Sequence, residues 1–370
     1  MLSQRPYCHQ ILLGLCVVLL CLTGGMMESA WACRALKPPA DAVDTLWVHL
    51  EGFCLTSDQR EQAVRGSDVL EAVKAGKNLD FQGALIVDDV QFDQLPLQDV
   101  SDIPDLPPSI RERLQQEGLT MVRVISGSIT IRDSQFEKNL ATNLVNDALV
   151  VLGEVNISGS TFVQALDFSK MIFTKPVVLR DSQVQHEGFF IGAQFEETAD
   201  FSHTTFGTHS RFHKAKFRAP VTFADVTFQG VAEFLEVEFL KVADFSRAKF
   251  MSGTGFSGAV FHGSADFSGI QTEREMYFRF SEFKQHVSFR DAKILHVLDF
   301  SNSSFEGEHN FSHAEVAVPP DFTSSNISVD IPVSGRKPSQ QSQWLLFGVL
   351  ITLVALYLWI SKKRASGHST

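Results

Sequence analysis

Basic residues are in the minority in this chain of 370 residues, which carries 32 Lys and Arg against 43 Asp and Glu and has a formal net charge of −11. A protein that binds nucleic acid needs a basic surface to meet the phosphates, so this shortage argues against a nucleic-acid partner. Tyrosine and tryptophan are also scarce, with 3 and 4 residues, whereas phenylalanine occurs 32 times. One aromatic residue in such excess indicates a repeated structural position rather than a mixed core.

Long apolar runs are confined to the two ends of the chain. Near the N-terminus, Arg5 precedes the apolar run Ile11–Leu22, and the small-residue site Ala30–Ala32 follows it. This apolar run is too short to span a bilayer, but it is typical of a signal-peptide core. The sequence therefore predicts a signal peptide over residues 1–32, with cleavage after Ala32.

The C-terminal run Trp344–Ile360 contains no charge and reaches about 25 Å as a helix, near the lower limit for a membrane span. The basic cluster Lys362–Arg364 follows it and is expected to stay on the cytoplasmic side. We therefore expect a linker over 330–343, a transmembrane helix over 344–360 and a cytoplasmic tail over 361–370. Together with the signal peptide, this predicts a single-pass type I membrane protein with most of the chain outside the cytoplasm.

Cysteine is rare, and only Cys33 and Cys54 remain once the predicted signal peptide is removed. An even pair in an oxidising compartment favours a disulfide, which would close a loop of about 20 residues and stabilise the fold by about 3 kcal/mol. Lipidation of Cys33 is the alternative, although the bulky Trp31 fits a lipidation site poorly.

The central region has a strict rhythm of large apolar residues. From Ile157 to Ile327, steps of five and six residues alternate over 32 positions, and 25 of these positions are Phe. The only polar residue among them is Thr272, and a small residue usually stands two places before each position. Neither a helix nor an ordinary strand has this period, but a solenoid with one large and one small inward residue per side does. The predicted inward ladder includes Phe201, Phe206, Phe212, Phe217, Phe223, Phe228, Phe234, Phe239, Phe245, Phe250, Phe256, Phe261 and Phe267.

Several units, such as ADFSH at 199–203, ADFSR at 243–247, ADFSG at 265–269 and LDFSN at 298–302, resemble the A(D/N)LXX repeat of the pentapeptide-repeat family. The resemblance implies an all-β solenoid, namely a right-handed quadrilateral (four-sided) β-helix. The extra residue in alternate units makes an 11-residue double repeat, so two double repeats are expected to form one 22-residue coil. We expect the extra residue to lie at two of the four corners.

The rhythm continues upstream less regularly, which predicts a β-helix over 79–329 with insertions near 97–122 and 137–150. Residues 33–78 are expected to form an N-terminal cap with a short helix from Asp68, preceded by Ser67 as its N-cap. Upstream ladder positions are expected at Phe81, Ile86, Phe92, Ile125, Ile131 and Phe136.

No catalytic constellation stands out. Asp200, Asp244, Asp266 and Asp299 precede ladder residues in repeat register, which indicates solvated or corner-bonding residues rather than the paired acids of a glycoside hydrolase. Most of the His residues lie between 186 and 313, and none recurs at the 22-residue coil spacing. We therefore predict no enzyme activity, no catalytic residue, no cofactor and no metal site.

These features favour a non-enzymatic, membrane-anchored scaffold outside the cytoplasm that binds a protein partner in the cell envelope. A carbohydrate-binding or carbohydrate-active β-helix is the alternative. Pentapeptide-repeat proteins include cytoplasmic acidic rods that resemble duplex DNA and bind type II topoisomerases. This minor alternative conflicts with the predicted leader and anchor, which place the chain in another compartment.

Overall fold

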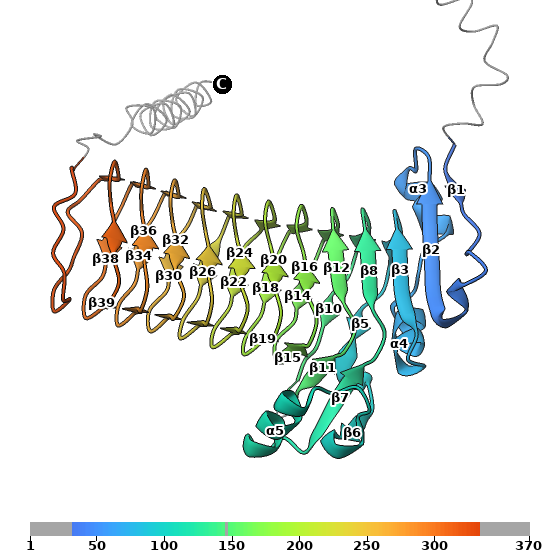
Figure 1. Cartoon of the computed structure of the whole chain (residues 1–370). Helices are drawn as coiled ribbons and strands as arrows, with labels where there is room; N and C mark the ends of the chain where they lie inside the picture. Colours follow the sequence, from blue (N-terminus) through green and yellow to red (C-terminus); the bar gives the residue numbers. More distant parts are fainter. Residues whose placement is uncertain (1–31, 145–146, 334–370) are drawn as a thin grey trace, which may run out of the picture.

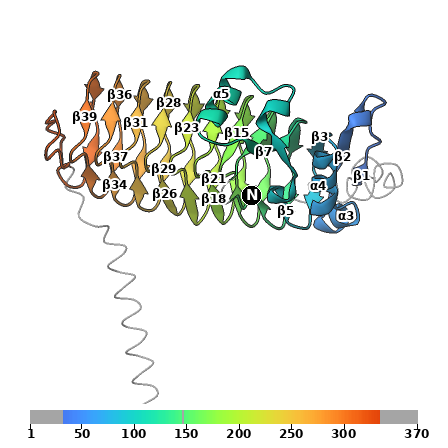
Figure 2. The ribbon, with the colours of Figure 1, turned by 90° about the horizontal axis from the view of Figure 1, so that it is seen from below.

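The computed structural model describes residues 32–144 and 147–333 as a straight rod of stacked β-coils (Figure 1). The cap region lies at the N-terminal end of the rod, and a side module (residues 97–122) projects from the N-terminal part of the rod between β5 and β7 (Figures 1 and 2). The predicted transmembrane segment, the cytoplasmic tail and all but the last residue of the predicted signal peptide lie outside the described residues. Within 32–144 and 147–333, none of the helices combines the length and the apolar character needed to cross a membrane.

Four sheets form the sides of the rod, and the chain passes through sheets 1, 2, 3 and 4 once in every coil. Sheet 1 contains β1 (Arg34–Ala35), β2 (Thr45–Glu51), β3 (Asn78–Gln82), β8 (Ile129–Arg132), β12 (Val155–Ser158), β16 (Val177–Val178), β20 (Ala199–Asp200), β24 (Val221–Thr222), β28 (Ala243–Asp244), β32 (Ala265–Asp266), β36 (Val287–Ser288) and β40 (His309–Asn310). Sheet 2 contains β4 (Leu85–Ile86), β9 (Gln135–Phe136), β13 (Thr161–Phe162), β17 (Gln183–Val184), β21 (Thr205–Phe206), β25 (Thr227–Phe228), β29 (Lys249–Phe250), β33 (Gln271–Thr272), β37 (Lys293–Ile294) and β41 (Glu315–Val316). Sheet 3 contains β5 (Val90–Gln91), β10 (Leu140–Ala141), β14 (Leu166–Asp167), β18 (Glu187–Phe189), β22 (His209–Arg211), β26 (Val231–Glu233), β30 (Thr254–Gly255), β34 (Met276–Tyr277) and β38 (Leu298–Asp299). Sheet 4 contains β6 (Leu97–Asp99), β7 (Met121–Ile125), β11 (Leu149–Val151), β15 (Met171–Phe173), β19 (Gln194–Phe195), β23 (Lys216–Phe217), β27 (Glu238–Phe239), β31 (Val260–Phe261), β35 (Glu282–Phe283) and β39 (Ser304–Phe305).

Neighbouring coils keep a constant 22-residue register through the regular part of the rod. Phe206 pairs with Phe228, and Phe228 pairs with Phe250. Sheet 3 has nine strands, so the described chain makes about nine turns. The predicted all-β solenoid is therefore confirmed.

Two kinds of corner connect the sheets. After sheets 1 and 3, the residue two places beyond the ladder residue has a left-handed backbone, as at His203 (φ 57°) and Lys214 (φ 56°). The N–H of Thr204 donates to the carbonyl of Phe201, which closes a β-turn whose third residue has a positive φ. The corners after sheets 2 and 4 take six residues from one ladder position to the next instead of five. The extra residue of the double repeat thus lies at these two opposite corners.

The core consists of columns of phenylalanine rings along the rod axis. The 13 Phe residues of the predicted ladder, from Phe201 to Phe267, are all at most 1% exposed. The ring of Phe223 stacks on that of Phe201 with centroids 4.8 Å apart and planes 3° apart, and it meets the edge of Phe212 at 5.4 Å and 89°. Both offset stacking and edge-to-face contact are favourable aromatic geometries, so each ring is held by neighbours along the column and across it.

The N-terminal cap contains more strand than the sequence predicts. β2 pairs with β3 in parallel, and β1 pairs with β2 in antiparallel, so they extend sheet 1 beyond the first coil. The helices of the cap are η2 (Ala42–Asp44), α3 (Thr56–Glu61) and α4 (Gly66–Lys74). α4 buries Val69 and Val73 in the rod core and covers the first coil.

Ser67 is not the N-cap of this helix. α4 begins at Gly66 with Arg65 as its N-cap, which makes no side-chain capping bond. A Cβ at Gly66 would lie 2.2 Å from the carbonyl oxygen of Asp89, so only glycine allows the helix to begin so close to the backbone that precedes β5. This tertiary contact decides the start of the helix.

The two insertions behave differently. Residues 97–122 leave the rod and form β6, η4 (Val100–Asp102) and α5 (Pro108–Gln116). The chain then returns through β7, which pairs with β6 in antiparallel. A further short helix, η3 (Phe92–Gln94), precedes them. Residues 137–150, in contrast, include β10 and part of β11, and Leu140 pairs with Leu166 of the next coil. This second insertion is therefore a coil that is slightly longer than the regular ones rather than a separate element.

The C-terminal coil is closed by a side chain. The amide of Asn326 accepts from the backbone N–H of Phe305 and donates to its carbonyl, both at 2.8 Å. These bonds replace those of a neighbouring strand at the edge of sheet 4, where an open edge would invite another strand to pair.

Candidate functional site

Cys33 and Cys54 lie at the N-terminal end of the rod. The Sγ atoms of Cys33 and Cys54 are 2.08 Å apart and their Cα atoms 4.5 Å apart, in a disulfide. The bond closes the loop that contains β1 and β2, next to an isolated bridge between Ala32 and Phe53. Its position ties the edge of sheet 1 together, which is a structural role.

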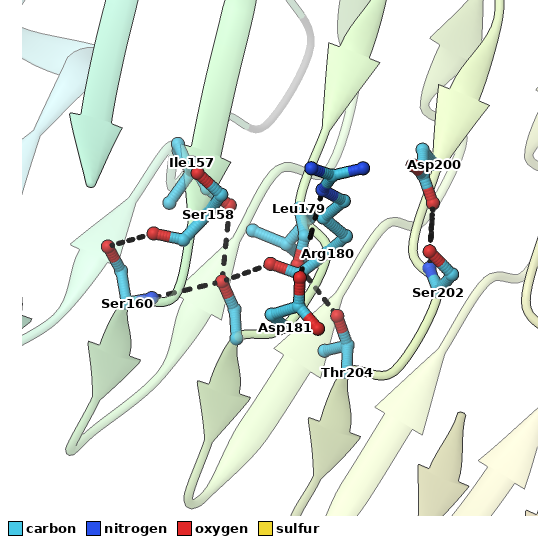
Figure 3. Close-up of polar contacts among 10 residues, drawn as sticks. Ile157, Ser158, Ser160, Leu179, Arg180, Asp181, Asp200, Ser202 and Thr204 are labelled. Atoms are coloured by element: carbon cyan, nitrogen blue, oxygen red, sulfur yellow. Dashed lines mark hydrogen bonds and ion pairs between the residues drawn. The ribbon is translucent and has the colours of Figure 1, made fainter. Parts of the chain in front are cut away.

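Buried hydroxyl groups line one inner corner of the N-terminal half of the rod. The hydroxyl of Ser182 donates to the carbonyl of Ile157 at 3.1 Å. Figure 3 shows the equivalent bond one coil later, in which the hydroxyl of Thr204 donates to the carbonyl of Leu179 at 2.6 Å. The backbone N–H of Ser160 in turn donates to the hydroxyl of Ser182 at 3.2 Å. Because these groups satisfy one another and the backbone inside the rod, they stabilise the coil and are closed to a ligand.

The repeated aspartates bond the corner that follows them. Asp200 accepts from the N–H of Ser202 at 2.9 Å (Figure 3), and Asp244, Asp266 and Asp299 each accept from the N–H two residues later at 2.8 Å. This geometry is the local turn that aspartate commonly forms with its own backbone. The aspartates thus stabilise the turns at the corners of the rod, which agrees with their regular position in the repeat.

Asp299 is the most buried of these carboxylates and carries a second contact. Burial alone raises the pKa of Asp299, but the hydrogen bonds from Ser301 and the ion pair with Arg279 outweigh it, so its pKa lies below the usual value. The nitrogen Nε of Arg279 lies 2.5 Å from Oδ2 of Asp299, and the guanidinium also lies 4.7 Å from the ring centre of Tyr277.

A polar cluster on the outer face of sheet 3 gathers around Glu233. One carboxylate oxygen of Glu233 lies 2.9 Å from Nε2 of His209, 3.1 Å from Nε of Arg211 and 3.2 Å from Nε2 of His213. Burial raises the pKa of Glu233, but the hydrogen bonds from His209 and Arg211 and the charges of His213 and His209 lower it overall. Arg211 already supplies a positive charge next to this oxygen. Within the described ranges, no three His, Cys, Asp or Glu side chains form a group that could hold a metal ion.

A groove of about 710 Å³ lies on the outer face of sheet 1 and its corner with sheet 2. Its floor includes Asp266, Ser268 and Ser288, and the hydroxyls of the two serines are 2.7 Å apart. Arg247 and Arg290 stand at its edge, and each is paired with an aspartate, at 2.6 Å to Asp225 and 3.2 Å to Asp291. This lining can hydrogen-bond a polar ligand, and in the described residues the hydroxyl of Ser268 bonds that of Ser288 rather than the imidazole of His286, which also lines the groove.

The groove and the Glu233 cluster were not predicted from the sequence. Their residues come from successive coils and point outward, where the inward rhythm sets no residue type. Reading the outward positions at the 22-residue coil spacing would have brought Arg211 and Glu233 together, because they are register partners in β22 and β26.

The comparison with known families decides the identity of the repeat. The profile of the family described as pentapeptide repeats (9 copies) matches residues 223–271. The 22-residue register and the left-handed corners extend well beyond this segment, from β11 to β41. The chain is a pentapeptide-repeat protein. No curated protein and no solved structure matches it significantly.

This pentapeptide-repeat protein carries its side module on the outer face of sheet 4. The module has its own core, in which Ile110 and Leu114 of α5 pack against outward residues of sheet 4 such as Val150 and Ile172. Arg113 of α5 also binds Glu196 of the rod at 2.6 Å. The buried apolar contacts and the largely buried ion pair hold the module in one position.

Proposed function

We propose that this pentapeptide-repeat protein is a non-enzymatic scaffold of the cell envelope. In this proposal it is a right-handed four-sided β-helix that is anchored in a membrane by residues 344–360, lies outside the cytoplasm and presents its side module to a protein partner. The observation that carries the proposal is the side module. It departs from the repeat, yet apolar contacts with sheet 4 and the ion pair between Arg113 and Glu196 fix its position on the rod. Insertions that leave a solenoid at one place are common sites of specific binding.

The helix α5 has the properties of a presented surface. Its inner side is fixed by burial of Ile110 and Leu114, and Arg111 donates at 2.7 Å to the carbonyls of Ser101 and Ile103. Its outer side exposes Glu112, Gln115 and Gln116 to solvent. A helix held rigidly from below loses little conformational freedom when a partner binds its outer side, which favours affinity.

The test is a double substitution on the outer side, Glu112→Lys with Gln116→Lys, in the full chain in its own membrane. We expect cross-linking to the partner to fall strongly, because the charge of the outer face is reversed while the seat of α5 is untouched. Glu308→Lys, which reverses an exposed charge at the far end of the rod, is the matched control and should cross-link like the parent. Equal cross-linking by the double variant and the parent would place the binding surface elsewhere.

The membrane topology has a separate test. Epitope tags after Cys54 and at Thr370 are followed by protease treatment of intact cells and spheroplasts. We expect the first tag to be cleaved from outside the cytoplasmic membrane and the second only after lysis. Protection of both tags in spheroplasts would contradict the type I topology and favour the alternative of an acidic rod in the cytoplasm.

The acidic-rod alternative is less well supported by the charge pattern. A mimic of duplex DNA needs a continuous negative stripe along the rod. The column at the corner between sheets 1 and 2 is instead mixed in charge, since Asp225 is followed in successive coils by Arg247, Gly269 and Asp291.

Carbohydrate binding is the second candidate, and the groove on sheet 1 is the observation that favours it. Serine hydroxyls, Asp266 and Asn310 offer both donors and acceptors in a space of about 710 Å³, as a sugar hydroxyl array requires. A glycan and hydrolase-substrate screen with the full chain, and with a Ser268→Arg variant whose side chain fills the groove, tests it. Binding by the parent that the variant loses would support the idea, and no binding by the parent would end it.

A further inference from the structure

The groove on sheet 1 contains a carboxylate that the fold leaves incompletely bonded. Asp266, on the floor of the groove, accepts a hydrogen bond from the backbone N–H of Ser268 at 2.8 Å. Asp200, which holds the same position in an earlier coil, accepts from both the N–H and the hydroxyl of Ser202, at 2.9 and 2.6 Å. In the groove the hydroxyl of Ser268 contacts that of Ser288 instead, at 2.7 Å. Among the described residues, the second carboxylate oxygen of Asp266 therefore has no partner.

A second aspartate lies beside Asp266 on the same face of the sheet. Asp244 and Asp266 are register partners in β28 and β32, which are about 4.8 Å apart as neighbouring strands, and like charges so placed destabilise a sheet. Asp225, and to a smaller extent Asp244 and Asp266, raises the pKa of Arg247, yet the guanidinium bonds to Asp225. Within 32–144 and 147–333, neither Asp244 nor Asp266 forms an ion pair, so both charges are left without a partner.

The net charge of the groove selects the sign of its ligand. Arg247 and Arg290 at its edge are each neutralised by their own aspartates, Asp225 and Asp291, so the charge that remains is that of Asp266 and its neighbour. An anionic ligand would be repelled here, whereas a cationic group would be attracted. No three His, Cys, Asp or Glu side chains of the described part form a group that could hold a metal ion. An ammonium group, with its three hydrogen-bond donors, is the cation that fits a free carboxylate oxygen beside hydroxyls.

The groove also contains neutral polar groups that have no partner. Ser246 lines the groove and is only 9% exposed, yet its hydroxyl bonds to none of the described residues. The same holds for the hydroxyl of Ser264, the imidazole of His286 and the amide nitrogen of Asn310. Val242, which is 48% exposed, adds an apolar wall. Free donors and acceptors beside an apolar surface suit a sugar ring, which has hydroxyls at its edge and C–H groups on its faces.

We propose that this groove binds a glycan that carries free amino groups, with an ammonium group at Asp266 and sugar hydroxyls at Ser246, Ser264 and Asn310. The inference rests on the second candidate function, carbohydrate binding, and names the class of sugar. An ammonium group bonds the free oxygen of Asp266 and relieves its repulsion with Asp244. A lysine side chain carries the same charge, but it would leave the free hydroxyls and amide of a groove of about 710 Å³ without partners.

The test compares two probes that differ only at the amino group, a hexamer of β-1,4-linked glucosamine and its fully N-acetylated form. Isothermal titration calorimetry measures their binding to the full chain in detergent. We expect the amino form to bind about tenfold or more tightly, because acetylation removes the charged hydrogen bond to Asp266. Equal binding of the two probes would overturn the amine assignment and leave carbohydrate binding standing. If neither probe binds, both proposals for this groove are wrong, whereas the scaffold function, which depends on the side module, is unaffected.

A pair of matched variants locates the amino group. Asp266→Asn keeps an oxygen for the corner bond with Ser268 but loses the charge, so the dissociation constant of the amino probe should rise about tenfold while that of the acetylated probe stays the same. Asp200→Asn removes the same charge from the same sheet outside the groove and should bind like the parent. Equal weakening by the two variants would mean that the overall negative charge holds the probe, which contradicts the proposed site. The comparison of the two probes uses the parent alone, so it stands even if a variant fails to fold.

Competition with a short oligolysine peptide distinguishes the two sources of an amine. We expect the peptide to displace the glucosamine hexamer poorly, because its side chains cannot bond the free hydroxyl of Ser246 and the amide of Asn310 in the way that sugar hydroxyls do. Displacement at equal concentration would assign the groove to a lysine-bearing protein and overturn the glycan.

Discussion

Thr272 is a polar residue at an inward position of an apolar column, and removing its hydroxyl should stabilise the protein. The side chain lies between Phe250 and Ile294 in sheet 2 and is 1% exposed. Among the described residues, its hydroxyl oxygen is buried without a hydrogen-bond partner. A buried hydroxyl of this kind costs about 1–3 kcal/mol of unfolding free energy. Valine has the same shape without the hydroxyl, so Thr272→Val should raise the unfolding free energy by about this amount.

Thr204 provides the matched comparison, because the same substitution there should have the opposite sign. Thr204 is also buried, but its hydroxyl donates to the carbonyl of Leu179 at 2.6 Å. Thr204→Val would remove this bond and leave the carbonyl with one partner fewer, which should lower the unfolding free energy by about 1–2 kcal/mol. The two variants change the same atoms and differ only in whether the hydroxyl is satisfied.

Urea unfolding followed by circular dichroism measures both effects against the parent. We expect the transition midpoint to move up for Thr272→Val and down for Thr204→Val, with similar slopes. If Thr272→Val is no more stable than the parent, the hydroxyl of Thr272 makes a favourable bond inside the rod, and the reasoning from the unpaired oxygen is refuted.

Three further outcomes follow from the core, the buried carboxylate of Asp299 and the side module. Phe223→Ala should cost about 3–5 kcal/mol in urea unfolding, because the ring is fully buried between two stacked neighbours, and Phe311→Ala, near the open end and 8% exposed, should cost less. Asp299→Asn keeps an oxygen for the corner bond but loses the charge. Because the pKa of Asp299 is lowered on folding, its charge stabilises the fold above the ordinary pKa of 3.8, and the difference from the variant should vanish as pH falls through the lowered folded pKa; a constant difference would contradict this. Arg113→Ala should speed hydrogen exchange in residues 100–119 and leave β24–β36 unchanged, because Arg113 joins α5 to Glu196; unchanged exchange in α5 would show that its apolar core alone holds it.

Much of the fold could be predicted because the inward positions obey a strong physical constraint. A narrow four-sided tube admits one large and one small inward residue per side, so burial selects the residue type at every fifth or sixth position. The positions of Phe201 to Phe267 follow from this rule. The strands of the cap do not, because β2 lies outside the repeat and its pairing with β3 is a tertiary contact that the inward rhythm does not specify.

The candidate sites could be predicted much less well. Outward positions are solvated, so many residue types are tolerated and the sequence carries no rhythm there. The Glu233 cluster joins side chains from different coils, and their contact depends on how the coils stack and on which rotamers face each other. The side module was visible only as an interruption near 97–122, and its seat on Val150 and Ile172 was not.

The solenoid, its 22-residue coil and its inward phenylalanine columns follow from the sequence alone, because the requirement to bury a large residue on every side repeats along the chain. The outward side chains that meet, such as Arg211 and Glu233, and the position of the side module on sheet 4 became evident from the structure alone. These features depend on contacts between coils, and the sequence rhythm sets no residue type at outward positions. The physical reason is that burial acts on every inward residue alike, whereas the surface is shaped by individual contacts across the stack.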